Sequence, residues 1–363
     1  MSRGRFLMLV SARVDAGLRE QVRTGRRPRP EYIVLEEVHG LRLLDWSQLG
    51  RTGRRRDLRS SLGHALAGLG ELGDHDAVLS DGEHVGVPLA LGMRALRRST
   101  PHVMIGHHVS SRAKRFAFRR LRPQRSISRL VLHSARQAEL AEKELGLEAS
   151  LLTLVPYGVD SRFWAPGAAA EQAIVVSAGR EHRDFLTLAQ ACGDFDTRVL
   201  VANDSQHSPA ARSSQPELWP SNFEVRPLDY MALRDAYSEA ALVVVPLLPT
   251  DFQAGVTTLL EAMAMGKAVI VSGTEGLRGL VEDQVTAITV PPGDVRALRA
   301  AAASLLGNPR ERARLGANAR AAVQSRFDIE RYAAALFGQL EAVASPGPIA
   351  WRSGTADQGS GLL

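Results

Sequence analysis

Short apolar runs recur along this chain, and longer segments of helical character separate them. Runs of this kind are typical of strands that are covered on both faces in a parallel sheet. We predict strands at residues 6–10, 32–35, 77–79, 102–105 and 130–132, and again at residues 173–177, 198–201, 223–225, 242–245, 268–271 and 287–290. This alternation predicts an α/β fold with two doubly wound, Rossmann-like parallel sheets that face a cleft.

The length of the chain and a linker-like segment near its middle predict two domains. A chain of 363 residues is long for a single hydrophobic core. Residues 156–172 are rich in Pro, Gly and Ala and lack periodicity, as expected of a linker. We therefore expect one domain over residues 1–160 and a second over residues 161–328. A helix at 329–344 is expected to pack back on the first domain, and residues 345–363 are expected to be disordered.

The composition is that of an ordinary globular protein, with 45% hydrophobic and 23% charged residues. No apolar run approaches the roughly 20 residues of a membrane-spanning helix. The single cysteine, Cys192, excludes an internal disulfide and is typical of the reducing cytoplasm. We expect a cytoplasmic protein without a cysteine-based zinc site.

Basic residues are concentrated in the first half of the chain, although the net charge is only +6. They gather in three runs, at residues 19–29, 51–59 and 112–129. Three interpretations remain open: a solvated or phosphate-facing surface, attraction to an anionic membrane, and nucleic-acid binding. The third run places Phe116 and Phe118 among arginines, as in a basic amphipathic helix that lies on the inner membrane face. No nucleic-acid-binding module is recognisable, so we expect no nucleic acid partner.

The segment after the predicted strand at 242–245 has the features of a phosphate-binding loop. Gly255 permits close approach of a ligand to the backbone, and Thr257 and Thr258 begin a helix whose free amides would point at an anion. Glu261 lies about one turn further along, where its carboxylate can accept hydrogen bonds from a ribose. The alternative is that the threonines only cap the helix and that Glu261 is a solvated helix residue.

A second cluster follows the predicted strand at 173–177. Arg180 and Arg183 lie there in a loop that enters a helix, and two guanidinium groups beside a helix N-terminus suit a diphosphate. The alternative is that both arginines lie on the surface, paired with Glu181 and Asp184. Because this loop and the loop at Gly255 both follow strands of one sheet, we expect the two loops to meet on one ligand.

Two adjacent histidines in the first half follow another predicted strand. His107 and His108 come directly after residues 102–105, where a histidine can hydrogen-bond a substrate hydroxyl or a developing charge. The sequence does not say which of the two faces the cleft. A packed structural histidine is the alternative interpretation.

Acidic residues occur in two further settings. Asp81 and Glu83 flank Gly82 directly after a predicted strand, and the three form either part of an acceptor pocket or an ordinary turn. Two Asp-x-Asp spacings, at residues 74–76 and 194–196, precede predicted strands and therefore lie at the opposite edge of each sheet. We interpret both spacings as turns and predict no catalytic metal.

Several phrases occur in a fixed order over most of residues 153–327. They are VPYGVDSRFWAP, SAGREHRD, LRDAYSEAALVVVPL, LLEAMAMGKAVIVSGTEGLRGLVED followed by TVPPGD, and RARLGANARAAVQSRF. In this order and spacing they resemble the retaining GT-B glycosyltransferases of family four (glycosyl transferases group 1), and the match is highly specific at family level. The first half resembles that family more loosely, through GHH and the strand pattern, as expected if it binds the acceptor.

The resemblance implies a donor-binding role for the second-half residues. Arg180 and Arg183 would bind the donor diphosphate. Thr257 and Thr258 would offer backbone amides to its phosphates, and Glu261 would hold the ribose.

The resemblance also implies contacts at the two ends of the donor. The backbone of Arg226, Pro227 and Leu228 would contact the nucleobase. His107 would lie near the reacting centre, with His108 as the alternative.

The chain departs from the family's pattern at the donor sugar. Gln253 stands where the family has its other glutamate, and Ala254, Gly255 and Val256 replace the usual Gly-Phe-Gly. Gln253 can still hydrogen-bond sugar hydroxyls, but as a neutral amide. Arg183 replaces a usual Lys and keeps the positive charge.

The implied reaction is hexosyl transfer from a nucleotide diphosphate sugar to an acceptor hydroxyl, with retention at the anomeric carbon. A retaining glycosidase would need two carboxylates about 5–5.5 Å apart, and the sequence contains no evident pair. The nucleotide sugar serves as the donor substrate, and no cofactor is expected. Two other functions stay open: a sugar-nucleotide 2-epimerase on the same architecture, and a non-catalytic nucleotide-sugar-binding protein.

Overall fold

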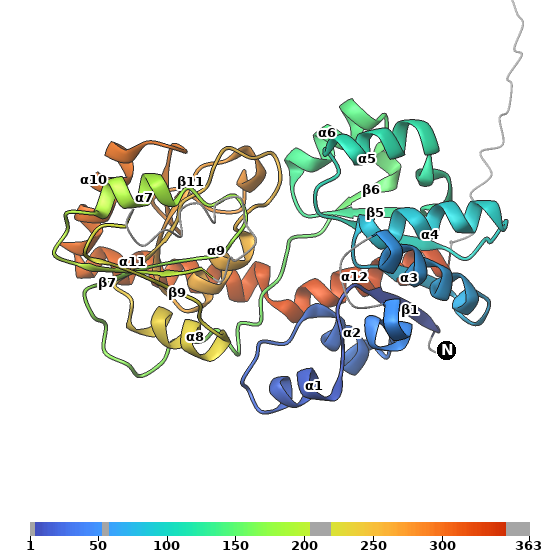
Figure 1. Cartoon of the computed structure of the whole chain (residues 1–363), viewed down its shortest axis with the longest axis horizontal. Coiled ribbons are helices and arrows are strands. Elements are labelled where there is room, and N and C mark those ends of the chain that lie inside the picture. Colours follow the sequence, from blue (N-terminus) through green and yellow to red (C-terminus); the bar gives the residue numbers. More distant parts are fainter. Residues whose placement is uncertain (1–3, 53–57, 204–218, 346–363) are drawn as a thin grey trace, which may run out of the picture.

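The computed structural model describes residues 4–52, 58–203 and 219–345, and it has two lobes (Figure 1). Each lobe contains a six-stranded sheet whose strands all run parallel. The predicted α/β architecture is therefore confirmed. The predicted tail at 345–363 falls almost entirely outside the described residues, as does most of the basic run at 51–59.

The first sheet has the strand order β2-β1-β3-β4-β5-β6. Its strands are β1 (Phe6–Val10), β2 (Arg42–Asp45), β3 (Ala77–Ser80), β4 (His102–Gly106), β5 (Arg129–Leu132) and β6 (Leu152–Leu154). The helices of this half are α1 (Ala16–Arg23), α2 (Glu31–His39), α3 (Leu58–Glu71), α4 (Glu83–Ala95), α5 (Arg112–Phe116) and α6 (Ala135–Leu145).

The second sheet has the strand order β12-β11-β10-β7-β8-β9. Its strands are β7 (Ile174–Ala178), β8 (Arg198–Ala202), β9 (Phe223–Arg226), β10 (Leu242–Val245), β11 (Ala268–Ser272) and β12 (Ile288–Val290). The helices that follow residue 173 are α7 (Phe185–Cys192), α8 (Tyr230–Glu239), α9 (Val256–Ala264), α10 (Val295–Leu306), α11 (Pro309–Ala322) and α12 (Ile329–Ala344).

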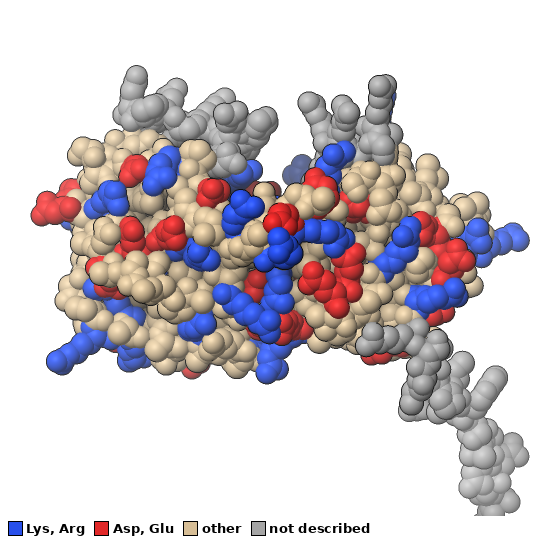
Figure 2. All heavy atoms as spheres, turned by 90° about the horizontal axis from the view of Figure 1, so that it is seen from below, with Lys and Arg blue, Asp and Glu red and all other residues tan. Residues whose placement is uncertain are grey.

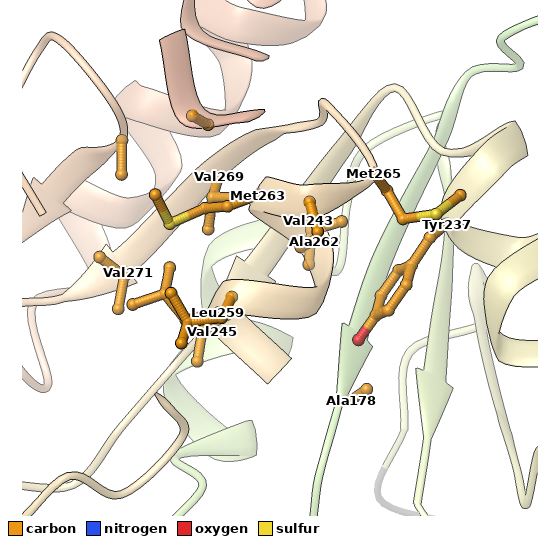
Figure 3. Close-up of a cluster of buried hydrophobic side chains, with 14 of the residues drawn as sticks. Ala178, Tyr237, Val243, Val245, Leu259, Ala262, Met263, Met265, Val269 and Val271 are labelled. Atoms are coloured by element: carbon orange, nitrogen blue, oxygen red, sulfur yellow. The ribbon is translucent and has the colours of Figure 1, made fainter. Parts of the chain in front are cut away.

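Strand β10 shows why the strands are apolar throughout. Successive side chains of a strand point to opposite faces of the sheet. Val243 and Val245 lie in one buried cluster with Leu259 of α9 (Figure 3), whereas Leu242 and Val244 lie in a second cluster on the other face. Both faces are covered, so every position of the strand is excluded from water, as expected of a parallel sheet.

One predicted strand is wrong. Residues 32–35 belong to helix α2, which starts after Pro30 and ends at Gly40 in the left-handed conformation. A short apolar run cannot be assigned to strand or helix by periodicity alone, and here Pro and Gly at the two ends were the informative signals. The sheet is completed instead by β2, which the sequence analysis missed together with β6. The other predicted strands are present, with ends that differ by one residue at most.

The third basic run does not form one amphipathic helix. Helix α5 passes at its end into a π-helical turn, Ala117–Leu121. Within this segment Phe118 is fully buried, whereas Phe116 and Leu121 are 62% and 44% exposed. Phe118 is therefore a core residue and is not available to a membrane. On the face that Figure 2 shows, basic and acidic side chains are interspersed over both lobes.

The chain crosses between the two sheets twice, and the crossings lie side by side. The Val159 amide donates a hydrogen bond to the carbonyl of Phe327 (2.8 Å), and the Val159 carbonyl accepts one from the amide of Ile329 (2.9 Å). The crossings approach so closely at Gly158 that an added Cβ would lie 2.5 Å from the Cβ of Tyr332. This paired crossing fixes where the second sheet begins relative to the first.

After the second crossing, helix α12 returns to the first sheet and lies beside α2 (Figure 1). Leu336 and Leu340 of α12 are fully buried in one cluster with Met8 and Val10 of β1. No helix within the described residues is both long enough and apolar enough to span a membrane.

The two neighbouring phenylalanines of the third basic run test the placement of that segment. Phe118→Ala removes a fully buried ring and should lower the free energy of unfolding by about 3–5 kcal/mol. Phe116→Ala, the matched control on the exposed side, should change it by no more than about 0.5 kcal/mol. Denaturant unfolding of both variants measures the difference. Equal effects would contradict this placement of the segment.

Candidate functional site

A cavity of about 670 Å³ is lined by residues from both halves of the chain. Most of its lining residues directly follow strands, so the cavity lies at the carboxyl ends of the two sheets, where α/β folds bind ligands. The first half contributes Ser11, Ala12, Glu31, Tyr32, Asp81, Glu83, His84, His107, Lys114, His133, Ser134, Gln137 and Tyr157. The second half contributes Gly179, Arg180, Glu181, Arg183 and the continuous segment from Phe252 to Thr258.

Arg183 is a buried cation at the wall of this cavity, with a side chain that is only 6% exposed. Its guanidinium donates to the carbonyl of Ala178 from Nε (2.8 Å), to the carbonyl of Glu181 from Nη1 (2.8 Å) and to Oγ1 of Thr258 from Nη2 (2.9 Å). Burial lowers its pKa to about 10, so the group stays charged at neutral pH. Among the described residues no carboxylate forms an ion pair with it. A buried cation without a counterion is costly unless a ligand supplies the negative charge.

The N-terminus of α9 faces the same space. Gly255 precedes the helix in the left-handed conformation, with φ of 81°, and no side chain caps the first amides. Gly255, Thr257 and Thr258 all line the cavity. Helix N-termini attract anions through their amides and the helix dipole. This loop and the arginine loop are in direct contact, because Arg183 donates a hydrogen bond to Thr258; that both bind one ligand stays a prediction.

The other predicted donor-side residues of these two loops also border the cavity. Arg180 is exposed and lines the cavity, as Arg183 does. Gln253 and Val256 line it as well. The amide nitrogen of Gln253 donates to the carbonyl of His133 across the cleft (3.0 Å), while its Oε1 is buried without a hydrogen-bond partner. Oε1 is thus an acceptor that a substrate hydroxyl can satisfy.

Glu261 does not line the cavity. It lies one turn deeper in α9, and burial raises its pKa to about 8, only partly offset by the charge of Arg183. The hydroxyl of Tyr237 is also buried, and among the described residues it has no hydrogen-bond partner. Burial and the nearby charge of Glu261 raise the pKa of this hydroxyl. The ribose contact that the family resemblance implies for Glu261 stays a prediction.

Arg226 and Leu228 also lie outside the cavity lining. Arg226 is exposed at the end of β9, where its Nε donates to Glu224 (2.5 Å). Leu228 is partly buried against the core of the second half. Their predicted contact with a nucleobase remains untested.

The two histidines occupy different environments. His107 lines the cavity, and its Nε2 lies 2.8 Å from the carbonyl of Asp81. His108 does not line it, because its ring stacks on Phe252 of the opposite half at a centroid distance of 4.3 Å. Of the two, His107 is the one that borders the cavity.

Asp81 and Glu83 both line the cavity, and Gly82 between them is buried outside its lining. Glu83 is 4% exposed and pairs with Nζ of Lys114 (2.8 Å). Burial alone would raise the pKa of Glu83, but Lys114, the nearby His107 and hydrogen bonds outweigh it and lower the pKa to about 2. Of the residues predicted on the acceptor side, Asp81 and Glu83 thus border the cavity and Gly82 does not; their role toward an acceptor stays a prediction.

Several lining residues were not anticipated. Ser11 and Ala12 directly follow β1, and His133 and Ser134 directly follow β5. The rule that found the other clusters would have found these four, had it been applied to every strand. Glu31 was missed because its segment was assigned to a strand.

The two Asp-x-Asp spacings lie away from the cavity. Asp76 accepts a hydrogen bond from the amide of Arg5 (2.7 Å), and Asp194 pairs with Arg299. Within the described residues no group of three or more His, Cys, Asp and Glu side chains is arranged to hold a metal ion. Both spacings thus serve as structural turns.

Gly179→Ala tests whether Arg183 organises an anion site. An added Cβ would lie 2.0 Å from Nη2 of Arg183, so the guanidinium would be displaced. We expect affinity for inorganic pyrophosphate, measured by titration calorimetry, to fall roughly tenfold or more, the scale of one lost charged hydrogen bond.

Gly293→Ala is the matched control for this variant. Gly293 has a similarly positive φ of 75° but has no atom within 4 Å of an added Cβ. The Gly293→Ala variant should therefore lose only about 1–2 kcal/mol of stability, the cost of an alanine in the left-handed conformation. It should bind pyrophosphate like the unmodified chain. Unchanged pyrophosphate affinity in Gly179→Ala would refute the role assigned to Arg183.

A family model described as "Glycosyl transferases group 1" matches residues 182–308. This range includes Arg183, the Gly255 loop and the whole of α9. No curated protein sequence matches the chain.

Solved structures with a similar fold span almost the whole chain. Sucrose-phosphate synthase from Thermosynechococcus elongatus has a TM-score of 0.71 at 18% identity, over 93% of this chain and 99% of its own. Anabaena Alr3699/HepE, solved with UDP and glucose, has a TM-score of 0.69 at 16% identity, over 93% and 100%. An α,α-trehalose 6-phosphate synthase from Burkholderia multivorans has a TM-score of 0.65 at 15% identity, over 95% and 99%. The chain therefore has the GT-B architecture of these glycosyltransferases.

Proposed function

We propose that this chain is a glycosyltransferase that moves a sugar from a nucleotide diphosphate sugar to an acceptor hydroxyl, with retention of the anomeric configuration. The observation that carries the proposal is the buried charge of Arg183, which forms no ion pair with a carboxylate among the described residues, beside the uncapped N-terminus of α9. A diphosphate supplies the missing anion. The family match over residues 182–308 and the shared fold support the same assignment.

The chemistry that these residues supply is stabilisation of the leaving group. As the bond between the anomeric carbon and the diphosphate oxygen breaks, negative charge grows on that oxygen. Arg180, Arg183 and the first amides of α9 would stabilise this charge. The acceptor oxygen would then bond to the anomeric carbon on the face from which the diphosphate leaves, and the diphosphate would take the proton of that hydroxyl, so that the anomeric configuration is retained.

The rest of the donor would follow from this anchor. The donor sugar would lie toward Gln253, whose Oε1 lacks a hydrogen-bond partner, and toward His107 on the opposite wall. The nucleoside would extend the other way, toward Glu261 and the β9 end with Arg226 and Leu228. UDP is the nucleotide to test first, because a structure of similar fold was solved with UDP-glucose.

Positive side chains at the diphosphate suggest that turnover needs no divalent metal. We also propose a cytoplasmic location, with peripheral contact to an anionic membrane as a further possibility to be tested. A separate groove of about 630 Å³, lined by Arg119, Arg122 and Arg125, would supply positive charge for such a contact. These arginines lie outside the lining of the main cavity.

The experiment measures donor binding and turnover together. UDP and UDP-glucose, followed by the GDP, ADP and TDP equivalents, should raise the melting temperature of the chain by mass action. Arg183→Ala should lower the affinity for the nucleotide by roughly 10- to 150-fold, the range for one hydrogen bond to a charged group. Arg296→Ala, an exposed arginine of α10, is the matched control and should bind normally.

Turnover distinguishes the proposal from its rivals. Nucleotide release should persist in excess chelator, and NMR of the product should show the anomeric configuration of the donor. An epimerised nucleotide sugar formed without acceptor would indicate a 2-epimerase. Binding without any donor cleavage would indicate a non-catalytic protein.

A further inference from the structure

The two walls of the cavity carry charge of opposite sign. The wall from the second half presents the two cations Arg180 and Arg183 and the single carboxylate of Glu181, so its net charge is positive. The wall from the first half presents the carboxylates of Glu31, Asp81 and Glu83. The positive wall suits the diphosphate of a donor, so the negative wall is the part of the cavity left for the other substrate.

One of the three carboxylates is already compensated. Glu83 pairs with Lys114 at 2.8 Å and also accepts a hydrogen bond from the backbone amide of His108 at 2.9 Å. This pair is close to neutral as a unit. The negative charge of the wall therefore rests on Glu31 and Asp81.

Asp81 has one satisfied oxygen and one unsatisfied oxygen. Its Oδ2 accepts hydrogen bonds from the amide (2.5 Å) and the hydroxyl (2.7 Å) of Ser11. Its Oδ1 is buried and has no hydrogen-bond partner. Within the part of the chain that the structure describes, no Lys or Arg forms an ion pair with Asp81.

Glu31 is in a similar position at the start of α2. The only hydrogen bond to its carboxylate among the described residues comes from its own backbone amide, and no Lys or Arg pairs with it. Burial, and secondarily the charge of Asp81, raises its pKa. The hydrogen bond from its own backbone amide and, more weakly, the charge of His107 oppose this rise in pKa. Two neighbouring carboxylates thus share a partly buried space with few donors of their own.

The unused acceptors define what the ligand must bring. Buried carboxylates are stable when hydrogen-bond donors and positive charge surround them. An ammonium group supplies three donors and one charge, whereas a phosphate would be repelled. Tyr32 and Tyr157 line the same wall.

We propose that the acceptor is a hydroxylated small molecule that presents a protonated amine, and no phosphate, to Glu31 and Asp81. This inference rests on the proposed glycosyltransferase function and names the acceptor class of that site. Amino sugars and aminocyclitols are acceptors of this class.

The test compares two matched sets of acceptors. One set is glucosamine, glucose and glucose 6-phosphate, and the other is 2-deoxystreptamine, myo-inositol and myo-inositol 1-phosphate. The readout is kcat/KM for acceptor-dependent nucleotide release at pH 7, with the best nucleotide sugar from the donor screen. In at least one set, kcat/KM for the amine should exceed that for the neutral compound by about tenfold, which is the effect of one hydrogen bond to a charged group. In the same set, kcat/KM for the phosphorylated compound should be the lowest of the three.

Variants tie this preference to the two carboxylates. Glu31→Gln and Asp81→Asn should each bring the amine close to the neutral compound, mainly through KM for the amine. Glu37→Gln, on the exposed side of the same helix, is the matched control and should keep the preference. UDP titration of each variant checks that the donor site is intact. If one of the two variants fails to fold, the other still tests the proposal.

Several outcomes would overturn the proposal. They are a phosphorylated compound that ranks first, an equal response to all three classes, no response to any of them, and a preference that survives in both variants. If the nucleotide binds and the donor is cleaved while the classes are not distinguished, only the acceptor class is wrong. If the nucleotide does not bind, the proposed function itself fails.

Discussion

The guanidinium of Arg183 ties the carboxyl end of β7 to the N-terminus of α9. It donates to the Ala178 carbonyl at the end of the strand and to the Thr258 hydroxyl in the first turn of the helix. The side chain passes beside Gly179, where any Cβ would collide with it. The positive charge is therefore held in place before a ligand arrives, which is the condition for strong electrostatic stabilisation in a site. Backbone hydrogen bonds add to this link, from the amide of Asp184 to the carbonyl of Pro246 (3.0 Å) and from the amide of Leu248 to the carbonyl of His182 (2.9 Å).

The second requirement is that the two sheets face one another. The paired backbone crossing at Val159 sets their relation at one end. At the cavity itself, Gln137 donates to the carbonyl of Asp251 (2.8 Å) and Gln253 donates to the carbonyl of His133 (3.0 Å). These contacts bring a positive wall and a negative wall to either side of one space. The proposed division of the cavity between an anionic donor and an amine-bearing acceptor rests on that arrangement.

Much of the fold and of the site could be predicted from the sequence, because both follow a local rule. Strands covered on both faces are uniformly apolar, and ligands bind where parallel strands end. That rule found Arg183, Thr258 and His107. It missed Glu31, because a buried helix and a buried strand share the same apolar run until Pro and Gly at their ends are considered.

Other features depend on distances that no local pattern contains. The burial of Glu261 beneath the loop is a property of the packed second half. The contrast between Phe118 in the core and Phe116 in solvent reflects a π-helical turn within an unbroken run of similar residues. The lack of a counterion at Asp81 among the described residues likewise becomes visible only when its neighbours are placed.

A crystal structure with a bound nucleotide diphosphate tests the central claim most directly. The account predicts the diphosphate at the N-terminus of α9, within hydrogen-bond distance of Arg183; a diphosphate bound among the arginines of residues 112–129 would contradict it.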